Sequence, residues 1–551
     1  MRRMSQFISL SAALLLVASS FLPIFVEAKT LTVCSACNYL SIQEAIDAAQ
    51  PGSTVLAKEG LYEESLRINK DLTLKGTDSK KVKVTGAEKD RSVLFIGPAD
   101  ITVRVEGLTF SMSKKPETTK GGKYHDLSGI RVSGGAKVTI VGCSLLENKN
   151  GLSVNPIAPE WFRESSGATS MSPPYPTPEV TVRETTVSNN SSQGINLLSC
   201  KGTIRNSKIS GNNTGILILE VAQEMGVKDV QVSISDNRIS DNGGPGIFSY
   251  ADLEDVEGSN NVMEGNGAEL GGNVPGTLRK PLREATKKKI VFTGEKYPTL
   301  QHAVDAALPK AKIVMEEGDY KGGITITKEL TIEAREAGAV IVRPNKGHVI
   351  SLVEGANLRL EGVKLAADGG AYGVQGGGTA KALIEDSNIS GHGSGLWLIG
   401  STRVKIISSD ISRNHWGMRL RQSSHADIEK TTIAKNQLVG IELDDLTRLR
   451  SPSIEIRKST ITQNGQRGGI LLKPALKSQA EAVIEGNDFI ENKGYGVSVG
   501  GHSCGLSLHQ LRFQGVVEGR DNHFQGNEKG SVCPTSLDFL MKKEGGKFSG
   551  K

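Results

Sequence analysis

The residues best suited to ligand chemistry recur at a regular interval in the second half of this sequence. They combine an indole ring, an imidazole, two guanidinium groups and two carboxylates. Such a set can stack on a sugar ring, pair with acidic groups and accept hydrogen bonds from hydroxyls. The six candidate substrate-binding residues are Trp397, His415, Arg419, Arg421, Glu442 and Asp444.

Alternation of apolar and polar residues explains why these side chains belong together. Apolar residues such as Leu396 and Leu398 alternate with the candidates, so the apolar set faces inward. Five candidates face outward in two neighbouring columns, and His415 lies at the adjacent turn. An Arg beside Glu442 or Asp444 also has the chemistry to support proton abstraction, but we assign no catalytic residue. The alternative interpretation is a surface ladder of ion pairs with little energetic weight.

The elements that must position these residues come from a short repeat. Each unit contains an Asn, which is preceded by a small polar residue, any residue, an apolar residue and two further residues. A Gly with alternating apolar residues follows a few positions later, as in Gly440–Leu443. Clean copies are 22 residues apart, from Asn190 to Asn212 and from Asn414 to Asn436. Strands this short bury a core only by stacking, each about 4.8 Å from the same strand of the next unit. We expect each Asn to take a left-handed bend and to bond to the Asn one coil away.

The same opening segment occurs twice in the chain. Residues 39–49 and 297–307 share a helical apolar spacing, and similar β-rich segments follow both. We interpret each as a short helix that covers the open end of a stack. The predicted fold class is all-β, with two tandem right-handed parallel β-helices, each with a short N-terminal capping helix. The expected boundaries are 29–275 for the first β-helix, 276–287 for a linker, 288–535 for the second and 536–551 for a basic, solvated tail.

The first 28 residues have the features of a secretory signal. Arg2 and Arg3 precede an apolar stretch, and Val26–Ala28 has the small-residue spacing of a cleavage site. We therefore predict a secreted or periplasmic protein with no membrane span after signal removal, and the alternative for this segment is a membrane anchor. The formal net charge of +6 is spread among interspersed acidic and basic residues, so no nucleic-acid partner is expected.

Six cysteines in an exported chain permit disulfide bonds. We expect Cys504 to pair with Cys533 as a C-terminal staple. Cys34 and Cys37 can form a local disulfide, and a metal-binding or redox CxxC motif is the alternative. The sequence assigns no metal ligand, and the cofactor is unknown.

The opening phrase at residues 39–49 and the Asn/Gly repeats together resemble the pectin-lyase-like parallel β-helix superfamily. The resemblance covers nearly all of the mature chain, but it implies a fold rather than one reaction, because the superfamily includes lyases, hydrolases, esterases, epimerases and a copper-site maturation protein. Gly391–Gly393 resembles the Gly-His-Gly of polygalacturonases, yet the paired acids that should precede it are absent. His392 also stands where other coils carry Asn, so we interpret it as a turn residue.

These observations favour a secreted protein that binds a polysaccharide or cell-surface glycan through the outer face of the second solenoid. Cleavage by a lyase or hydrolase mechanism stays open, since no family catalytic motif is intact. The alternatives are a non-catalytic scaffold for protein interactions and a periplasmic metal-maturation factor.

Overall fold

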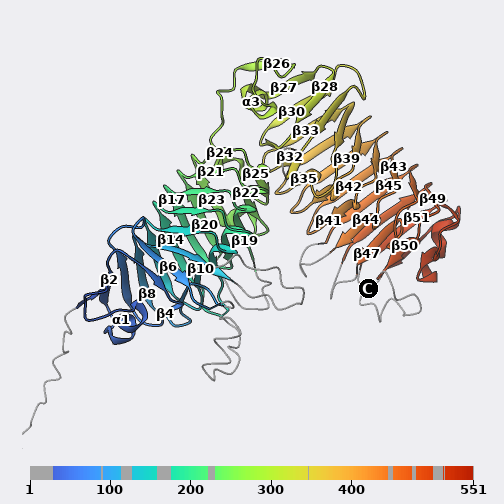
Figure 1. Ribbon diagram of the computed structural model, residues 1–551. Coiled ribbons are helices and arrows are strands. Elements are labelled where there is room, and N and C mark those ends of the chain that lie inside the picture. Colours follow the sequence, from blue (N-terminus) through green and yellow to red (C-terminus); the bar gives the residue numbers. More distant parts are fainter. Residues whose placement is uncertain are drawn as a thin grey trace, which may run out of the picture.

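The computed structural model describes residues 29–88, 91–112, 127–157, 175–220, 230–344, 347–444, 451–473, 479–500, 513 and 515–549. In these residues the chain forms short parallel strands that stack into two β-helices, or solenoids, one after the other (Figure 1). The predicted fold class is confirmed. The predicted signal segment, residues 1–28, lies outside the described residues.

Each coil supplies one short strand to each of three sheets because apolar residues alternate with polar ones. A representative coil contains β17 (Lys201–Arg205), β18 (Lys208–Ser210) and β19 (Thr214–Leu219). Ile204, Ile209 and Ile216 point inward and are fully buried. Ile209 pairs in register with Val187 of the preceding coil and Ile239 of the following coil, so like residues stack in columns.

The first solenoid has three sheets in the described residues. One runs from β1 (Thr30–Val33) to β23 (Val256–Ser259), and a second, the corner sheet, runs from β3 (Gly60–Glu63) to β24 (Val262–Glu264). The third, which we call the first junction sheet, contains β4 (Leu66–Ile68), β7 (Leu94–Ile96), β10 (Ser128–Val132), β13 (Asn150–Val154), β16 (Gln193–Leu198), β19, β22 (Pro245–Ser249) and β25 (Ala268–Gly272).

The second solenoid repeats this plan. One sheet runs from β26 (Lys287–Phe292) to β54 (Gly546–Ser549), and another runs from β28 (Gly318–Lys321) to β52 (His523–Gln525). The second junction sheet contains β29 (Ile324–Ile326), β32 (His348–Leu352), β35 (Tyr372–Gly376), β38 (Ser394–Leu398), β41 (Trp416–Leu420), β44 (Val439–Asp444), β47 (Ile470–Lys473), β50 (Tyr495–Val499) and β53 (Gly530–Cys533).

The recurring Asn residues form a buried ladder along one corner of each solenoid. Asn190 Nδ2 donates to Asn212 Oδ1 at 2.8 Å, and the Asn190 backbone N–H donates to the same oxygen. The left-handed bend falls on the preceding residue, such as Asn189 with φ of 58°, and not on the ladder Asn as we expected. That bend turns the chain so that the following amide points inward to its neighbour. His392 heads the second ladder, where its N–H donates to Asn414 Oδ1 at 2.9 Å, in agreement with its interpretation as a turn residue.

Short helices cover the first coil of each solenoid, as predicted. They are α1 (Ile42–Ala48) and α3 (Leu300–Ala306), and each buries an apolar face on the stack. The hydroxyls of Ser41 and Thr299 cap them by accepting a hydrogen bond from the backbone N–H three residues later.

The C-terminal residues do not form the solvated tail that we expected. They fold into a 3₁₀ segment, η4 (Thr535–Met541), and into β54, which pairs antiparallel with β51 (Val516–Arg520). Leu537 and Leu540 are fully buried against the last coil. The sequence prediction was based on the lysines in this segment and did not take the apolar residues between them into account.

The two solenoids meet at an angle where the junction sheets face each other (Figure 1). The last strand of the first solenoid, β25, packs on β29, β32 and β35. Gly272 N–H donates to Gln375 Oε1 at 3.1 Å, and Asn273 Nδ2 donates to Gln422 Oε1 at 3.2 Å. From this contact the two junction sheets diverge toward β4 and β50.

Candidate functional site

The predicted site residues lie on the outer side of the second junction sheet, where the alternation placed them. Trp397 pairs in register with Arg419, and Arg419 pairs with Glu442 in the next coil. The flanking residues Leu396 and Leu398 are buried inside the solenoid. The column therefore exists, but it faces the first solenoid instead of open solvent near the junction.

Trp397 is not the exposed stacking platform that we expected. Its side chain is only 7% exposed, because its ring stacks on Phe248 of β22 with centroids 5.4 Å apart and planes 8° from parallel. Tyr372 packs against the same indole, with a centroid distance of 4.8 Å. Trp397 therefore joins the two solenoids, and a sugar ring finds no open indole face here.

Four of the predicted residues meet in one ionic cluster. Arg421 Nη2 lies 2.8 Å from Asp444 Oδ2, and Arg419 lies 3.5 Å from the same oxygen and 3.3 Å from Glu442 Oε1. Glu442 is completely buried, so it too differs from the exposed residue that we expected. A carboxylate withdrawn from water in this way requires close cationic partners.

Two further cations complete this cluster, and neither was among the predicted site residues. Arg467 Nη1 lies 2.8 Å from Glu442 Oε2, and Lys473 Nζ lies 3.0 Å from Glu442 Oε1. Lys473 occupies the column of Arg421 and Asp444, where the alternation of the sequence places it. Arg467 comes from the turn before β47, where the repeat departs from its regular length and gives no signal. We call Arg419, Arg421, Glu442, Asp444, Arg467 and Lys473 the ionic cluster.

His415 and Trp416 connect to the ionic cluster at the start of β41. The guanidinium of Arg419 lies over the Trp416 ring, 4.7 Å from its centroid, and the His415 ring meets Trp416 edge-on at 4.2 Å. His415 Nδ1 contacts Gln437 Oε1 at 3.1 Å. His415 thus borders the cluster through Trp416 and forms no ion pair of its own among the described residues.

Two tyrosines that the sequence prediction missed border the same region. Tyr250 of the first solenoid and Tyr372 of the second both pack against Trp397. Burial raises the pKa of Tyr250 to about 12, and Arg421 and Arg419 oppose that shift. Burial likewise raises the pKa of Tyr372, again opposed by Arg419 and Arg421. Both phenols are therefore protonated hydrogen-bond donors at neutral pH, and they lie within electrostatic reach of the two guanidinium groups.

The region offers more hydrogen-bond donors than acceptors. Within the described residues, no acceptor is found for the buried indole N–H groups of Trp397 and Trp416 or for Nε of Arg421. Both carboxylates already accept from several cations. This arrangement suits a ligand that brings acceptor oxygens.

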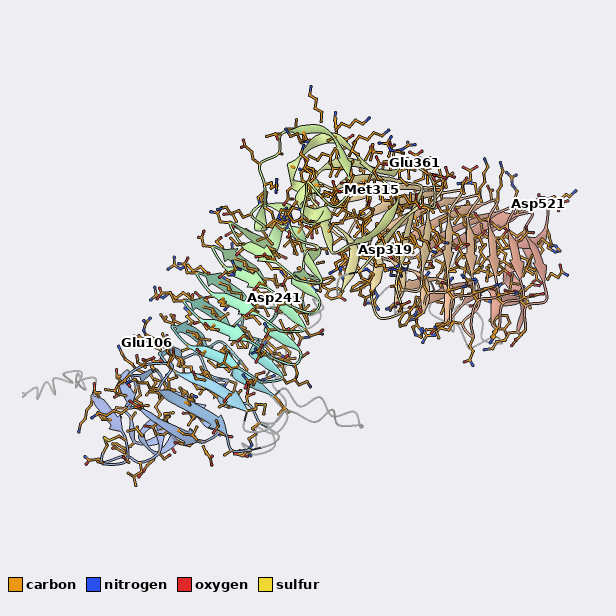
Figure 2. The ribbon with its side chains drawn as sticks, turned by 45° about the horizontal axis from the view of Figure 1, so that its top comes forward. Glu106, Asp241, Met315, Asp319, Glu361 and Asp521 are labelled. Carbon is orange, nitrogen blue, oxygen red and sulfur yellow. A yellow bond between two sulfur atoms is a disulfide. The ribbon has the colours of Figure 1, made fainter. Side chains whose placement is uncertain are left out.

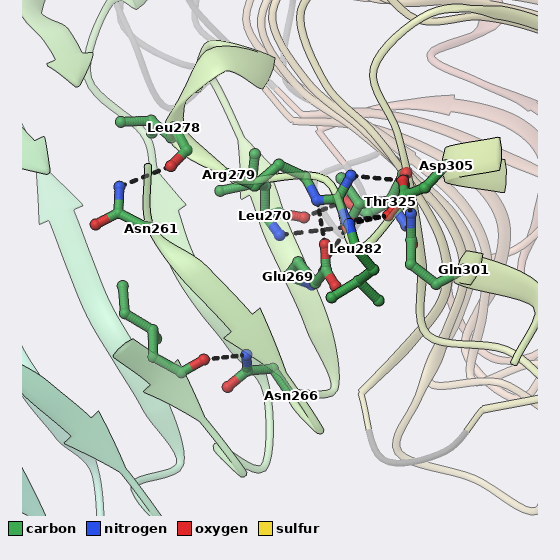
Figure 3. Close-up of polar contacts among 12 residues, drawn as sticks. Asn261, Asn266, Glu269, Leu270, Leu278, Arg279, Leu282, Gln301, Asp305 and Thr325 are labelled. Carbon is green, nitrogen blue, oxygen red and sulfur yellow. Dashed lines mark hydrogen bonds and ion pairs between the residues drawn. The ribbon is translucent and has the colours of Figure 1, made fainter. Parts of the chain in front are cut away.

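A second buried charge cluster fixes the junction itself (Figure 3). Arg279, which follows the 3₁₀ segment η3 (Gly276–Leu278), donates from Nε to Glu269 of β25 and from Nη1 and Nη2 to Asp305 of α3 at 2.7 and 2.8 Å. All three residues are almost fully buried. The region predicted to be a linker is therefore a structural clamp between the last coil of one solenoid and the cap of the other.

The clamp contains a Gln–Asp pair that is present in both copies of the duplicated opening segment. In the first cap, Gln43 Nε2 donates to Asp47 Oδ1 at 2.8 Å, and in the second, Gln301 Nε2 donates to Asp305 Oδ1 at 3.0 Å. Asp47 is exposed, whereas Asp305 receives Arg279. The same Gln–Asp pair thus orients a helix at one end of the molecule and anchors the junction at the other.

Cys34 and Cys37 form a local disulfide, which excludes a reduced metal-binding motif at this position in the structure. Cys533 is disulfide-bonded, whereas Cys504 lies outside the described residues, so the expected Cys504–Cys533 pairing stays a prediction. In the described part of the chain, no group of three or more His, Cys, Asp or Glu residues is arranged to hold a metal ion. No helix among the described residues has the length and apolar character needed to cross a bilayer.

The family model named right handed beta helix region matches residues 128–274 and 348–513, which together are more than half of the chain. The chain therefore belongs to this family of right-handed β-helix proteins, and the expected family resemblance is confirmed. No curated protein sequence matches the chain at the significance required.

Several solved β-helix structures are similar to this chain at low sequence identity. The PL6 family alginate lyase AlyGC is 13% identical, covers 92% of this chain and 100% of its own, and has a TM-score of 0.31. The family 28 exopolygalacturonase of Yersinia enterocolitica is 11% identical, covers 81% of this chain and 78% of its own, and has a TM-score of 0.35. The pectin methylesterase PemA from Erwinia chrysanthemi is 14% identical, covers 57% and 90%, and has a TM-score of 0.26.

Proposed function

We propose that this chain is an exported protein that binds an acidic polysaccharide or cell-surface glycan through the ionic cluster on the second junction sheet. The supporting observation is the charge of the cluster. Four cations surround two carboxylates, so four minus two leaves a formal charge of +2. Guanidinium groups recognise carboxylates and sulfates by paired hydrogen bonds, and an aromatic ring beside them adds a surface for a sugar ring.

The accessible parts of the cluster define where a glycan would bind. The side chains of Arg467 and Lys473 are 34% and 35% exposed, whereas those of Arg419 and Arg421 are 16% exposed. Arg467 and Lys473 would make the first contact with an acidic sugar. Trp416 and Tyr372, both part-buried, would take the stacking role that we had assigned to Trp397.

Export is part of the same proposal. The Cys34–Cys37 disulfide supports it, because such bonds persist in oxidising compartments outside the cytosol. Sequencing the N-terminus of the mature protein tests the predicted cleavage after residue 28. A mature chain that still begins at Met1 would contradict export by a cleaved signal.

The decisive experiment is electrophoresis of the full mature chain through gels that contain polygalacturonate, alginate or a neutral β-glucan. We expect retardation in at least one acidic gel. The double variant Arg467→Gln and Lys473→Gln should reduce that retardation at least tenfold in apparent affinity. Lys405→Gln, at an exposed cation on another sheet, is the matched control and should behave as the wild type.

Three other outcomes would change the proposed function or contradict it. New ultraviolet absorbance from unsaturated sugars would show lyase activity in addition to binding. Migration unchanged by every acidic polysaccharide would contradict glycan binding and leave the protein-interaction scaffold as the alternative. A stoichiometric metal in the purified protein would favour the metal-maturation alternative.

A further inference from the structure

A groove of about 480 Å³ crosses four coils of the first solenoid, well away from the ionic cluster. It lies at the corner between the corner sheet and the first junction sheet, along the Asn ladder. Its volume is in the range of small-molecule sites, roughly 300–1,000 Å³. The lining residues are Glu147, Asn148, Asn189, Asn190, Ser191, Gly211, Asn212, Asn213, Asp241 and Gly243.

The residues at the left-handed bends shape this groove. Successive coils carry Glu147, Asn189, Gly211 and Asp241 at that position, each with a positive φ. Asp241 is labelled on the first solenoid in Figure 2. Gly211 leaves the centre of the column without a side chain, so the corner is hollow there.

The matching corner of the second solenoid is built differently. Three successive left-handed positions along it carry the long side chains of Arg413, Lys435 and Gln463, which have φ of 56°, 55° and 54°, and Gly391 precedes them. The bend therefore accepts long residues without losing its conformation. Asn189, Gly211 and Asp241 of the first solenoid are shorter than the Arg, Lys and Gln at these three bends of the second.

The groove is polar, and it contains both donors and acceptors. Its floor consists of ladder amides such as Asn190 and Asn212, whose hydrogen-bonding groups are used between coils. Its rim carries Asn189, Ser191 and Asn213, and none of these side chains makes a hydrogen bond in the described structure. No Lys or Arg belongs to the lining, whereas Glu147 and Asp241 do.

We propose that this groove is a second carbohydrate site, which binds a neutral, hydroxyl-rich glycan chain along the axis of the first solenoid. Amide and hydroxyl groups satisfy sugar hydroxyls because each can donate and accept. The carboxylates accept further hydrogen bonds from hydroxyls, but they repel an anionic chain. The first solenoid would thus select a different glycan from the one that the cationic cluster selects.

A single substitution that copies the second solenoid tests the site. Asn189→Lys introduces a long side chain at the rim, at a bend where Lys435 already shows that lysine is accommodated. Ser191→Arg is a second variant that obstructs the same groove from another position. Gln463→Lys makes the equivalent change at the corner of the second solenoid and serves as the matched control, with the circular dichroism spectrum recorded for all three.

The probes are soluble xylan, mannan, hydroxyethyl cellulose and amylopectin, each tested by affinity electrophoresis of the full mature chain. We expect retardation by at least one, an at least tenfold loss of affinity in Asn189→Lys and Ser191→Arg, and no change in Gln463→Lys or Arg467→Gln. Retardation by none of the four, or wild-type retardation of both groove variants, would overturn the proposal. The proposed function instead predicts that binding of acidic polysaccharides depends on Arg467 and Lys473 and is unaffected by the groove variants, so failure here and failure of the proposed function give different results.

Discussion

Trp397 of the second solenoid stacks on Phe248 of the first, with ring centroids 5.4 Å apart and planes 8° from parallel. Tyr250 packs against the edge of this pair. The contact adds large aromatic surfaces to a junction that also contains the hydrogen bonds of Gly272 and Asn273 and the buried side chain of Val353, which packs with the core of the first solenoid. The angle between the solenoids is therefore set by aromatic packing as well as by the Glu269–Arg279–Asp305 clamp.

Replacing Trp397 with Ala should loosen the junction. The substitution removes a buried indole and leaves a cavity against Phe248, which costs roughly 3–5 kcal/mol. We expect urea unfolding to show this loss and small-angle scattering to show a wider range of solenoid angles. Leu61→Ala, at an exposed apolar residue, is the control and should change stability by less than about 0.5 kcal/mol. An unchanged scattering profile would show that the clamp alone holds the angle.

The junction should weaken as pH rises through neutrality. Burial raises the pKa of the Glu269 carboxyl from its usual 4.5 to about 7, with Arg279 opposing the shift and Asp305 adding to it. Because the folded-state pKa is the higher one, protonated Glu269 stabilises the folded protein. That contribution is complete below about pH 4.5 and is lost as pH rises through about 7. Unfolding temperatures measured between pH 4.5 and 8 should therefore fall toward the upper end.

Glu269→Gln isolates this contribution from other titrations. Glutamine keeps an acceptor for Arg279 but cannot ionise, so the difference in unfolding temperature between wild type and variant should change with pH across this window. The groups that act on Glu269 are Arg279, Asp305 and Glu264. Glu481→Gln, at an exposed carboxylate of the second solenoid that is not among them, is the control. A difference that stays constant from pH 4.5 to 8 would contradict the expected titration.

The Asn ladder should be sensitive to a single deletion. Asn436 Nδ2 donates to Asn464 Oδ1 and to the Ile411 carbonyl, and its Oδ1 accepts from Asn414 N–H. Asn436→Ala leaves these buried groups without partners, at a cost of about 1–3 kcal/mol for each group left unsatisfied. Urea unfolding should show this loss, whereas Gln437→Ala on the exposed side of the same turn should have little effect.

Binding of an acidic glycan should be strongly salt-dependent. Electrostatic screening extends over about 10 Å at 0.1 M salt and about 3 Å at 1 M, so the exposed cations Arg467 and Lys473 lose most of their attraction at high salt. We expect affinity electrophoresis or titration calorimetry to show weak or no binding at 1 M NaCl. Arg467→Gln should show a smaller salt dependence than the wild type. Equal affinity at both salt concentrations would indicate a ligand bound without ionic contacts.

The periodic features of this molecule were accessible from sequence because they repeat. Stacked Asn residues, the inward position of Leu396 and the register of Trp397 with Arg419 all follow from coils of similar length. The duplicated opening segment likewise predicted both capping helices. Each of these inferences rests on many copies of the same local pattern.

The environment of the site could not be predicted in this way. Trp397 is buried because Phe248 comes from another solenoid, and that contact depends on the angle at the junction. The angle depends on Arg279, a single residue outside every repeat. Arg467 enters the ionic cluster from an irregular turn for the same reason. Sequence periodicity gives the direction of a side chain but contains no information on which distant surface covers it.

The antiparallel strand β54 closes one edge of the last coil of the second solenoid. A stack of parallel coils presents unpaired backbone groups at its last coil, which can recruit another coil from a neighbouring molecule and so start a fibre. In this chain the final strand runs antiparallel along β51, and η4 closes over the core beside it. Deleting residues 535–551 should therefore expose an edge that can pair with another chain, whereas β54 occupies the backbone groups of that edge in the intact protein.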